Sequence, residues 1–442
     1  ILQIKHTNDE RFDLVSARLI NKYHFVTAIQ SQKIYMFTGK IYDNNKALAL
    51  IKEECEKQII NCSEHDTLEV ISKIKRKTYK SLEDFDSDPN LITVENGILN
   101  LDTLELTPHT PANLSKILIP CDFITPKSYD IEANLKDTLF WKYLTNSFTI
   151  NGKFLQKDFE TVLEMMASVF VKEQIDEKSF MNLGQGENGK STTLEYLSQL
   201  LGSDNITSIP LQVLSSDKFA SSNLDGKLAN IFPDLEKNEL RHTGIIKVIS
   251  SGETCYAQSK GKDGFELHPI AKLIFSSNKF PKVYDQTQGF FRRWIIIKWL
   301  RDFEKDPERI DKLKQKLKEN QEEKNQVFSS LMIIAQQLKT NGKFTFSKDW
   351  KTIQKLWNEN ADPVNDFIEN YIIDSESHKG KRETYQFYKQ KMFEKGEIPL
   401  GMGQFGKAFA EYYEESKNDG MRIWLNIDFK EPKQEELESF HA

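Results

Sequence analysis

The chain has 442 residues, which is too long for one ordinary domain, so we expect two or three domains. Its 60 basic and 66 acidic residues give a net charge of −6, which excludes the overall basic character of a small nucleic-acid-binding protein. Any contact with nucleic acid must therefore use local basic features. The sequence has no stretch apolar enough to cross a membrane and no C-x-x-C pair, and four separated cysteines are typical of a cytoplasmic protein.

The first 150 residues mix short extended segments with helices. Residues 33–37 read as a strand, and residues 44–62 carry apolar side chains near helical spacing. Residues 91–101 read as two short strands about an Asn-Gly turn. The region contains no catalytic constellation, so residues 1–150 are predicted to form a scaffold or assembly domain.

The stretch with the clearest chemistry is residues 184–192, which fits the phosphate-binding pattern G-x-x-x-x-G-K-[ST]. An apolar run precedes it and a helical pattern follows, as strand, loop and helix should. Lys190 can reach the β- and γ-phosphates, and the Ser191 hydroxyl can bind Mg²⁺. The residues expected to bind the nucleotide are Gly184, Gly186, Glu187, Asn188, Gly189, Lys190, Ser191 and Thr192. A glycine-rich surface turn beside a surface lysine is the alternative.

Polar residues follow two further predicted strands. A short apolar run ends in Asp234 and Glu236, which project to the same side if the strand continues through them. One carboxylate then holds Mg²⁺ and the other polarises the attacking water. Residues 271–278 form another apolar strand, and Asn278 at its tip either senses the γ-phosphate or is a plain turn former.

Basic residues mark two more places. Arg292 and Arg293 precede a core strand, either as a solvated strand entry or as an arginine finger that neutralises transition-state charge. Lys260 and Lys262 lie at the tip of a predicted β-hairpin. They suit contact with a phosphate backbone, and a plain polar turn fits the same residues equally well.

The remaining segments are predicted as structural. Residues 154–172 read as a core helix, and the charge-dense residues 304–325 as a solvated helix or linker. Near the end, residues 403–413 read as a helix and residues 421–427 alternate like the β-ribbon of a wing. A plain helical packing domain is the alternative there.

In this order the motifs resemble those of superfamily 3 DNA helicases of the AAA+ class, especially the helicase half of phage, plasmid and poxvirus-type primase–helicases. The segments that carry the resemblance are GQGENGKST (184–192), ANIFPDLE (229–236), the lysine-bearing hairpin 247–264, LIFSSNKFP (273–281) and GFFRRW (289–294). It extends to the segments ENGILNL (95–101), DPVNDFI (362–368) and YQFY (385–388).

The resemblance implies an α/β fold whose AAA+ P-loop domain has a central parallel sheet. This ATPase domain is expected at 151–345, after a mixed, mainly helical N-terminal assembly or DNA-facing domain at 1–150. A winged-helix-like DNA-binding domain is expected at 346–442.

The resemblance also implies roles for single residues. Catalytic roles fall to Lys190, the Walker B acids Asp234 and Glu236, the sensor Asn278, and Arg292 or Arg293 as a finger on the neighbouring subunit's ATP. Mg²⁺ is expected on Ser191 and Asp234, and single-stranded DNA on Lys260 and Lys262. Pro233 departs from the family's usual apolar approach to the Walker B acids.

The implied function is ATP-dependent replicative helicase or replication initiator of a mobile genetic element, in the cytoplasm of a bacterial or virus-infected cell. It would bind single-stranded and duplex DNA at a replication origin, as a homo-oligomeric ring, typically a hexamer that moves 3′ to 5′. No primase-like acidic motif is present in the sequence, so a separate primase or polymerase is an expected partner. A non-translocating AAA+ origin-binding or loader ATPase is the main alternative, and a small-molecule P-loop kinase a weaker one.

Overall fold

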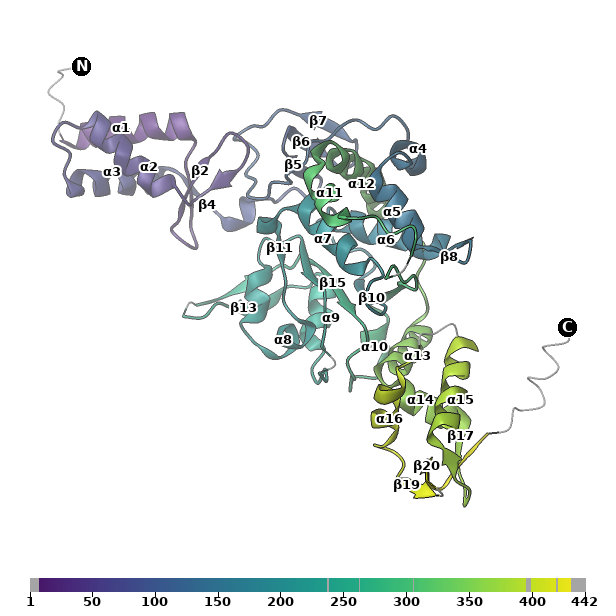
Figure 1. The fold of residues 1–442 in the computed structure, drawn as a ribbon. Helices are drawn as coiled ribbons and strands as arrows, with labels where there is room; N and C mark the ends of the chain where they lie inside the picture. The colour runs from purple at the N-terminus through teal and green to yellow at the C-terminus, as the bar shows by residue number, and fades with distance from the viewer. Residues whose placement is uncertain are drawn as a thin grey trace.

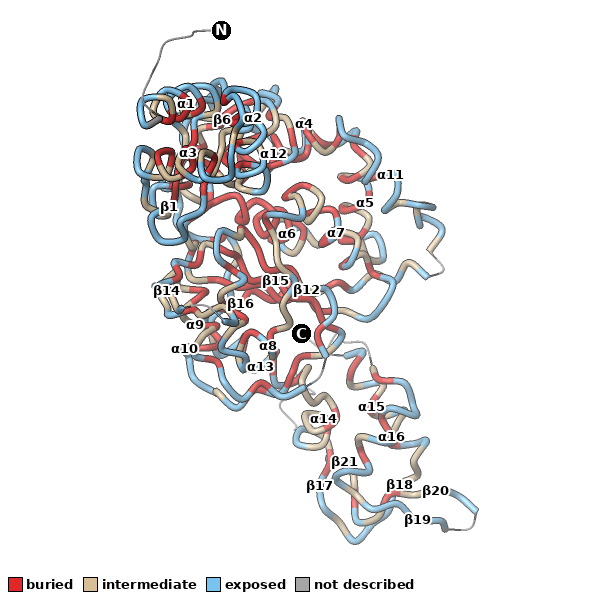
Figure 2. The backbone as a smooth tube through the Cα atoms, turned by 90° about the vertical axis from the view of Figure 1, so that its left-hand side faces the viewer, coloured by how far each residue is buried: buried red, intermediate tan, exposed pale blue. Residues whose placement is uncertain are grey.

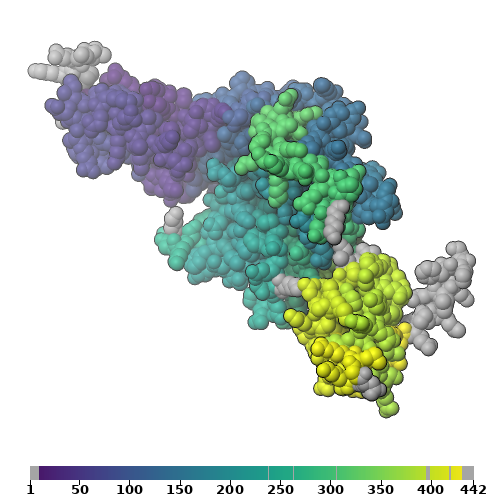
Figure 3. Space-filling model, viewed as in Figure 1, coloured from purple at the N-terminus to yellow at the C-terminus, as the bar shows by residue number. Residues whose placement is uncertain are grey.

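The computed structural model describes residues 8–430, apart from residues 237, 262, 305, 395–398 and 419. A central body carries a small N-terminal unit at one end and a small C-terminal unit at the other (Figures 1 and 3). None of the helices in the described ranges has the length and apolar character that a bilayer crossing needs.

The N-terminal unit packs three helices around a core of its own. The helices are α1 (Asn8–Tyr23), α2 (Ala47–Gln58) and α3 (Glu64–Lys77), with a sheet in the order β3-β2-β1-β4 made of β1 (Val26–Ala28), β2 (Ile34–Phe37), β3 (Tyr42–Asp43) and β4 (Tyr79–Lys80). The predicted strand at 33–37 is confirmed as β2. The predicted helix at 44–62 is α2, which is shorter at both ends. It begins late because the Asn45 amide donates to the Asp43 carboxylate at 3.1 Å in a turn before α2.

Residues 82–154 lead into the central body. They form η1 (Leu82–Asp84), the antiparallel sheet of β5 (Leu91–Val94), β6 (Gly97–Asn100) and β7 (Glu105–Thr107), then α4 (Ile131–Leu135), α5 (Leu139–Ser147), β8 (Thr149–Ile150) and β9 (Lys153–Phe154). The two-residue turn between β5 and β6 is Glu95-Asn96, one residue earlier than predicted. Asn96 is fixed there because its side-chain amide bonds both backbone groups of Phe123, at 2.9 and 3.0 Å.

The central sheet has five parallel strands in the order β11-β12-β15-β10-β16. They are β10 (Ser179–Leu183), β11 (Ile206–Thr207), β12 (Ala229–Phe232), β15 (Lys272–Ser277) and β16 (Trp294–Lys298). Most of their residues are buried, including polar ones such as Asn182 and Lys272, because both faces of the sheet are covered. Figure 2 shows β12 and β15 running through the buried interior.

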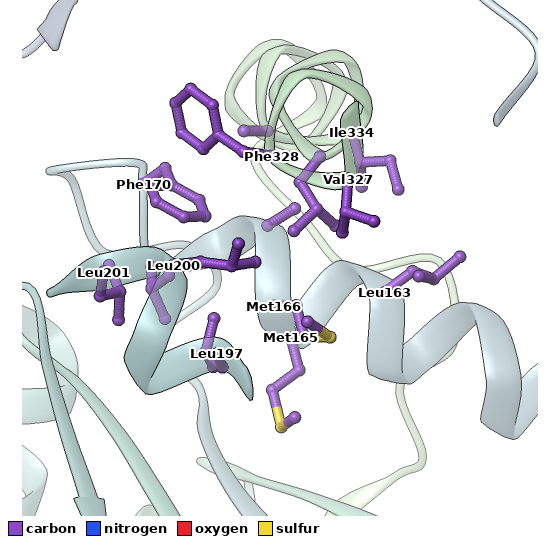
Figure 4. Packing of buried hydrophobic residues seen from close by; sticks show 14 of the residues in the cluster. Leu163, Met165, Met166, Phe170, Leu197, Leu200, Leu201, Val327, Phe328 and Ile334 are labelled. Carbon is purple, nitrogen blue, oxygen red and sulfur yellow. The ribbon is translucent and has the colours of Figure 1, made fainter. Parts of the chain in front are cut away.

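Successive residues of each strand point to opposite faces of the sheet and so enter two different cores. Phe180 and Ile295 enter the first core, whereas Met181 and Ile296 enter the second. The first core is covered by α6 (Gln156–Ser168), α7 (Lys190–Leu201) and α12 (Gln321–Asn341), with α5 and the β5–β6 hairpin packed into it. Figure 4 shows Val327, Phe328 and Ile334 of α12 gathered above the side chains of α6 and α7.

The second core lies under four short helices and a projecting hairpin. These elements are α8 (Leu211–Ser216), α9 (Gly244–Ser251), α10 (Gln288–Phe291) and α13 (Trp350–Ala361), with the antiparallel hairpin of β13 (Cys255–Gln258) and β14 (Gly264–Leu267). The connections include η2 (Ser203–Asn205), η3 (Ala220–Leu224) and α11 (Leu313–Glu319). The predicted helix at 154–172 is the shorter α6, and the charge-dense residues 304–325 contain α11 and the start of α12.

The C-terminal unit has a separate core that begins at Val364. Its elements are α14 (Pro363–Tyr371), β17 (Ile372–Asp374), β18 (Lys379–Gly380), α15 (Lys381–Glu394), α16 (Met402–Phe409), β19 (Glu415–Asn418), β20 (Met421–Trp424) and β21 (Ile427–Phe429). The strands form a β18-β20-β19 sheet and a β17-β21 pair. The predicted helix at 403–413 is α16, which ends at Phe409. The predicted ribbon at 421–427 is two strands, because Asn426 has a φ of 58° and breaks the run.

Candidate functional site

The carboxyl ends of three neighbouring strands open into one cavity of about 960 Å³. Because β15 lies between β10 and β12, the loop after each strand reaches the same place. Lys190 and Ser191 at the start of α7, Asp234 after β12 and Asn278 after β15 all line this cavity. The structure thus brings together four residues that the sequence analysis drew from segments far apart in the chain.

The loop between β10 and α7 has a backbone that only glycine suits at two positions. A Cβ on Gly184 would meet the Asn188 side chain at 2.3 Å and the Trp299 carbonyl oxygen at 2.4 Å. Gly189 has a φ of 95°, and a Cβ there would lie 2.6 Å from the Tyr143 hydroxyl. Of the predicted binding residues, Gly184 does not line the cavity. The other seven do: Gly186, Glu187, Asn188, Gly189, Lys190, Ser191 and Thr192.

The Lys190 ammonium is buried against oxygen atoms of its own loop. It donates to the Gly184 carbonyl, to the Gln185 carbonyl at 3.0 Å and to Asn188 Oδ1 at 3.1 Å. Burial lowers the pKa of Lys190 to about 8, and the charge of Asp234 opposes that shift. An anionic ligand bound to the loop could replace these neutral oxygens as the hydrogen-bond acceptor of the Lys190 ammonium.

Tyr143 of α5 holds the loop from behind, and the sequence analysis did not single it out. Its hydroxyl donates to the Gly189 carbonyl at 2.5 Å and lies 2.9 Å from Thr193 Oγ1. The side chain is buried and lines the cavity. A tyrosine about 40 residues before the loop carries no sequence signal, because only the tertiary fold brings α5 to this position.

The two predicted acids lie in different surroundings. β12 ends at Phe232, so Asp234 and Glu236 follow it on a loop and do not share one strand face as predicted. Pro233 has no N–H with which to continue a strand ladder, which accounts for the early end. Asp234 lines the cavity, whereas Glu236 is exposed outside it and accepts from the Asn238 amide at 2.7 Å.

The cavity contains oxygen donors and positive groups that could hold a magnesium-bound nucleoside triphosphate. The Ser191 hydroxyl and the Asp234 carboxylate are the donor types that Mg²⁺ prefers. Lys190 and the N-terminal end of α7 supply positive charge for phosphate groups. The cavity is also large enough for a ligand of this size.

The arginine pair lies at the amino-terminal ends of the strands, whereas the cavity lies at their carboxyl ends. β10 and β16 run parallel with Ser179 opposite Trp294, so Arg292 and Arg293 sit beside the start of β10, whereas the phosphate loop follows its end. Five strand residues separate the two ends by roughly 16 Å. Neither arginine lines the cavity of its own chain.

The two arginines differ in exposure and in the number of contacts that they make. Arg293 is buried and donates to the Gly289 carbonyl, to the Lys247 carbonyl at 3.2 Å and to Ser251 Oγ at 2.9 Å. Arg292 is exposed, and its guanidinium pairs with Glu177 alone among the described acids. Arg293 therefore fastens α9 to the α10 turn, and Arg292 is the arginine that faces outward.

The predicted hairpin is confirmed as β13–β14, although residues 247–251 of the expected range belong to α9, and it projects from the central body (Figures 1 and 3). Lys260 is exposed near its tip, and Lys262 lies outside the described residues. Tyr256 on β13 is 70% exposed, with its ring lying over the backbone of Gly264. An exposed aromatic ring near a basic tip is a combination that the sequence pattern did not single out.

A further wall of the cavity comes from residues predicted as a solvated linker. This wall consists of Glu308, Arg309, Ile310, Asp311, Lys312, Leu313 and Lys314, which line the same cavity as the phosphate loop. The prediction of a solvated helix or linker at 304–325 agrees with α11 and with the exposed side chains there, but it missed that this stretch lines the cavity. Its charge density gave no sign of the contact, since solvated helices have the same composition.

Three family models match the chain in consecutive segments. "D5 N terminal like" matches residues 17–150, "Family of unknown function (DUF5906)" residues 183–293, and "Poxvirus D5 protein-like" residues 359–441. The middle segment contains the phosphate loop, both acids, Asn278 and the arginine pair.

Two curated viral proteins and one solved structure are similar to this chain. "Putative helicase L207/L206" of Acanthamoeba polyphaga mimivirus is 26% identical over 53% of this chain and 24% of its own length. "Putative helicase 184R" of Invertebrate iridescent virus 6 is 23% identical over 48% of this chain and 22% of its own length. The chain thus matches about a quarter of each relative. The apo A form of the NrS-1 C-terminal region shares the fold at a TM-score of 0.50 and 12% identity, over 93% of this chain and 98% of that one.

Proposed function

We propose that this chain is an ATP-driven DNA helicase, the replicative helicase or replication initiator of a mobile genetic element, because D5-type family models match its first and last segments and putative viral helicases are similar to it. One observation supports this function above the others. Lys190, Asp234 and Asn278 share a cavity at one edge of the sheet, and Arg292 faces outward at the opposite edge. A site divided in this way is complete only between two copies of the chain, as in a ring.

Within one chain, the cavity residues bind and orient ATP. Lys190 leaves its carbonyl partners for the phosphate oxygens, and the loop amides and the α7 N-terminus hold the rest of the triphosphate. Asp234 and Ser191 hold Mg²⁺, which supplies charge neutralisation on the phosphates when bound. Asn278 positions the attacking water by its side-chain amide. Glu236 polarises that water only if its loop turns toward the cavity.

The neighbouring copy supplies Arg292. An arginine that reaches the γ-phosphate from outside stabilises the charge that develops during phosphoryl transfer. Arg292 suits this role because its single carboxylate partner, Glu177, is itself exposed, so a phosphate can replace it at little cost. The ring is proposed as a hexamer that moves 3′ to 5′, as in superfamily 3 helicases, with a separate primase or polymerase as partner.

DNA contacts are proposed for two parts of the chain. Lys260 and Tyr256 on the β13–β14 hairpin offer a charge and an aromatic face, the two features that hold single-stranded nucleic acid. Lys262, which lies outside the described residues, is proposed to act with Lys260. The order of helix, strand, two helices and hairpin in the C-terminal unit suits a winged-helix-like domain that binds duplex DNA.

Strand displacement on a forked DNA duplex tests the function. Wild-type protein with MgATP should separate the strands, whereas a non-hydrolysable analogue and the Lys190→Ala variant should not. Displacement with the analogue as efficient as with ATP would contradict translocation. ATP hydrolysis without displacement would favour the alternative, an origin-binding or loader ATPase.

A matched variant tests the hairpin in the same assay. Lys260→Ala should reduce displacement and binding of single-stranded DNA while leaving ATP binding unchanged, because the hairpin lies away from the cavity. Equal displacement by this variant and wild type would show that Lys260 belongs to a simple turn.

A further inference from the structure

The strap, which we define as residues 306–314, forms part of the cavity wall and contacts the phosphate loop through Glu187. We propose that Arg309 of the strap is a ligand of the triphosphate, and that it exchanges its carboxylate partner in the phosphate loop for phosphate oxygens when nucleotide binds. This inference rests on the proposed ATP site and adds to it a cationic group supplied by the same chain, separate from the neighbour's arginine.

The strap is fastened at its beginning. The Arg301 guanidinium bonds the Asp306 carboxylate at 2.7 Å and pairs with Glu308, and it also donates to the Asn146 carbonyl at 2.7 Å. Just before the strap, the Phe303 amide donates to the Glu187 carbonyl at 2.8 Å, which ties the chain to the phosphate loop. Arg301 is largely buried, so these contacts fix where the strap begins.

The strap is also fastened at its far end. Lys314 pairs with Glu195 of α7 at 2.9 Å, and Leu313 packs against the first core. Between these two anchors, the middle of the strap is exposed to solvent and faces the cavity. Arg309 and the phosphate loop therefore line the same cavity that a bound nucleotide would occupy.

Arg309 already contacts the phosphate loop through Glu187. Its guanidinium lies 3.6 Å from the Glu187 carboxylate, with both side chains more than half exposed. An exposed pair of this length contributes little, about 0–1 kcal/mol. Phosphate oxygens carry more charge than one carboxylate and accept a guanidinium in a two-point geometry. Exchange of the Glu187 carboxylate for phosphate oxygens is therefore favourable.

Competition binding with two ligands tests the inference. A fluorescent ATP analogue is displaced by MgATP or by inorganic triphosphate, with wild-type, Arg309→Ala and Lys316→Ala proteins. We expect Arg309→Ala to weaken both ligands by the same factor, on the order of tenfold, as for a lost charge-assisted bond. Lys316 is the matched control, because it is an exposed cation on α11 that does not line the cavity, so its variant should bind both ligands like wild type.

The Glu187→Gln substitution gives a second measurement that does not depend on loss of binding. Removing the carboxylate should tighten triphosphate binding more in the wild-type background than in the Arg309→Ala background. A gain of equal size in both backgrounds means that Glu187 only repels phosphate, and it would overturn the exchange of partners.

The outcomes separate this inference from the proposed function. If wild type binds MgATP and Arg309→Ala binds it equally, only the role of Arg309 fails. If Arg309→Ala weakens ATP but not inorganic triphosphate, Arg309 contacts the nucleoside and the phosphate contact is wrong. If wild type binds neither ligand, the proposed ATP site fails, and the inference fails with it.

Discussion

At the residue scale, the burial of Lys190 gives nucleotide affinity a pH dependence. Burial lowers the pKa of Lys190 to about 8, and bound phosphate should raise that pKa because negative charge favours the ammonium. Binding then takes up a proton above pH 8, so MgATP affinity should fall as the pH rises from 8 to 9.5, by up to about tenfold per pH unit. Lys190→Arg keeps its charge in this range and should show a flatter curve. Parallel curves for the two proteins would contradict the assignment.

Tyr143 allows a second test at the same scale. Tyr143→Phe leaves the Gly189 carbonyl without its buried donor, so we expect a loss of unfolding free energy of about 1–2 kcal/mol and weaker MgATP binding. Tyr42→Phe is the matched control, because this buried tyrosine donates to the Pro111 carbonyl at 2.9 Å, away from the cavity. It should lose similar stability in denaturant unfolding and keep its affinity. Equal affinities for the two variants would show that Tyr143 does not support the loop.

At the element scale, the turn between α10 and β16 carries two arginines with different expected roles: Arg293 stabilises the fold and Arg292 acts on ATP. Arg293→Ala removes bonds that fasten this turn to α9, so it should lower the unfolding free energy by about 2–4 kcal/mol. Arg292→Ala removes an exposed group and should change stability by less than about 1 kcal/mol while abolishing most ATP hydrolysis. Chemical denaturation and steady-state ATPase assays check both. Normal hydrolysis by Arg292→Ala would exclude it as the finger.

At the scale of the whole molecule, the cores predict where the chain can be cut. The N-terminal unit has its own core up to Ile74, whereas Phe140 and Leu144 share the first core with α6 and α7. Removal of residues 1–81 should therefore leave a folded protein that binds MgATP. Removal of residues 1–150 should expose the first core and give aggregated or unfolded protein. Circular dichroism and size-exclusion chromatography distinguish these outcomes.

The sequence predicted those features that local chemistry determines. The phosphate loop, the β13–β14 hairpin and β15 follow from glycine, turn and apolar patterns, and the strand order then brings Asn278 beside Asp234. Features that depend on tertiary contact were missed. Nothing near Tyr143 or Arg309 distinguishes either residue from a core tyrosine or a solvated arginine, because their partners lie 46 and more than 100 residues away in the chain. The direction of Glu236 was also missed, since Pro233 ends β12 before the acids are reached.

The separation of Arg292 from the phosphate loop also has a consequence for enzyme kinetics. No rotation of side chains within one chain closes a gap of roughly 16 Å across a five-residue strand. If Arg292 acts on ATP, turnover per chain must then depend on protein concentration, falling on dilution as neighbours dissociate and recovering when DNA gathers the copies on one strand. A plot of specific activity against concentration should rise steeply and level off, and a flat plot would mean that each chain works alone.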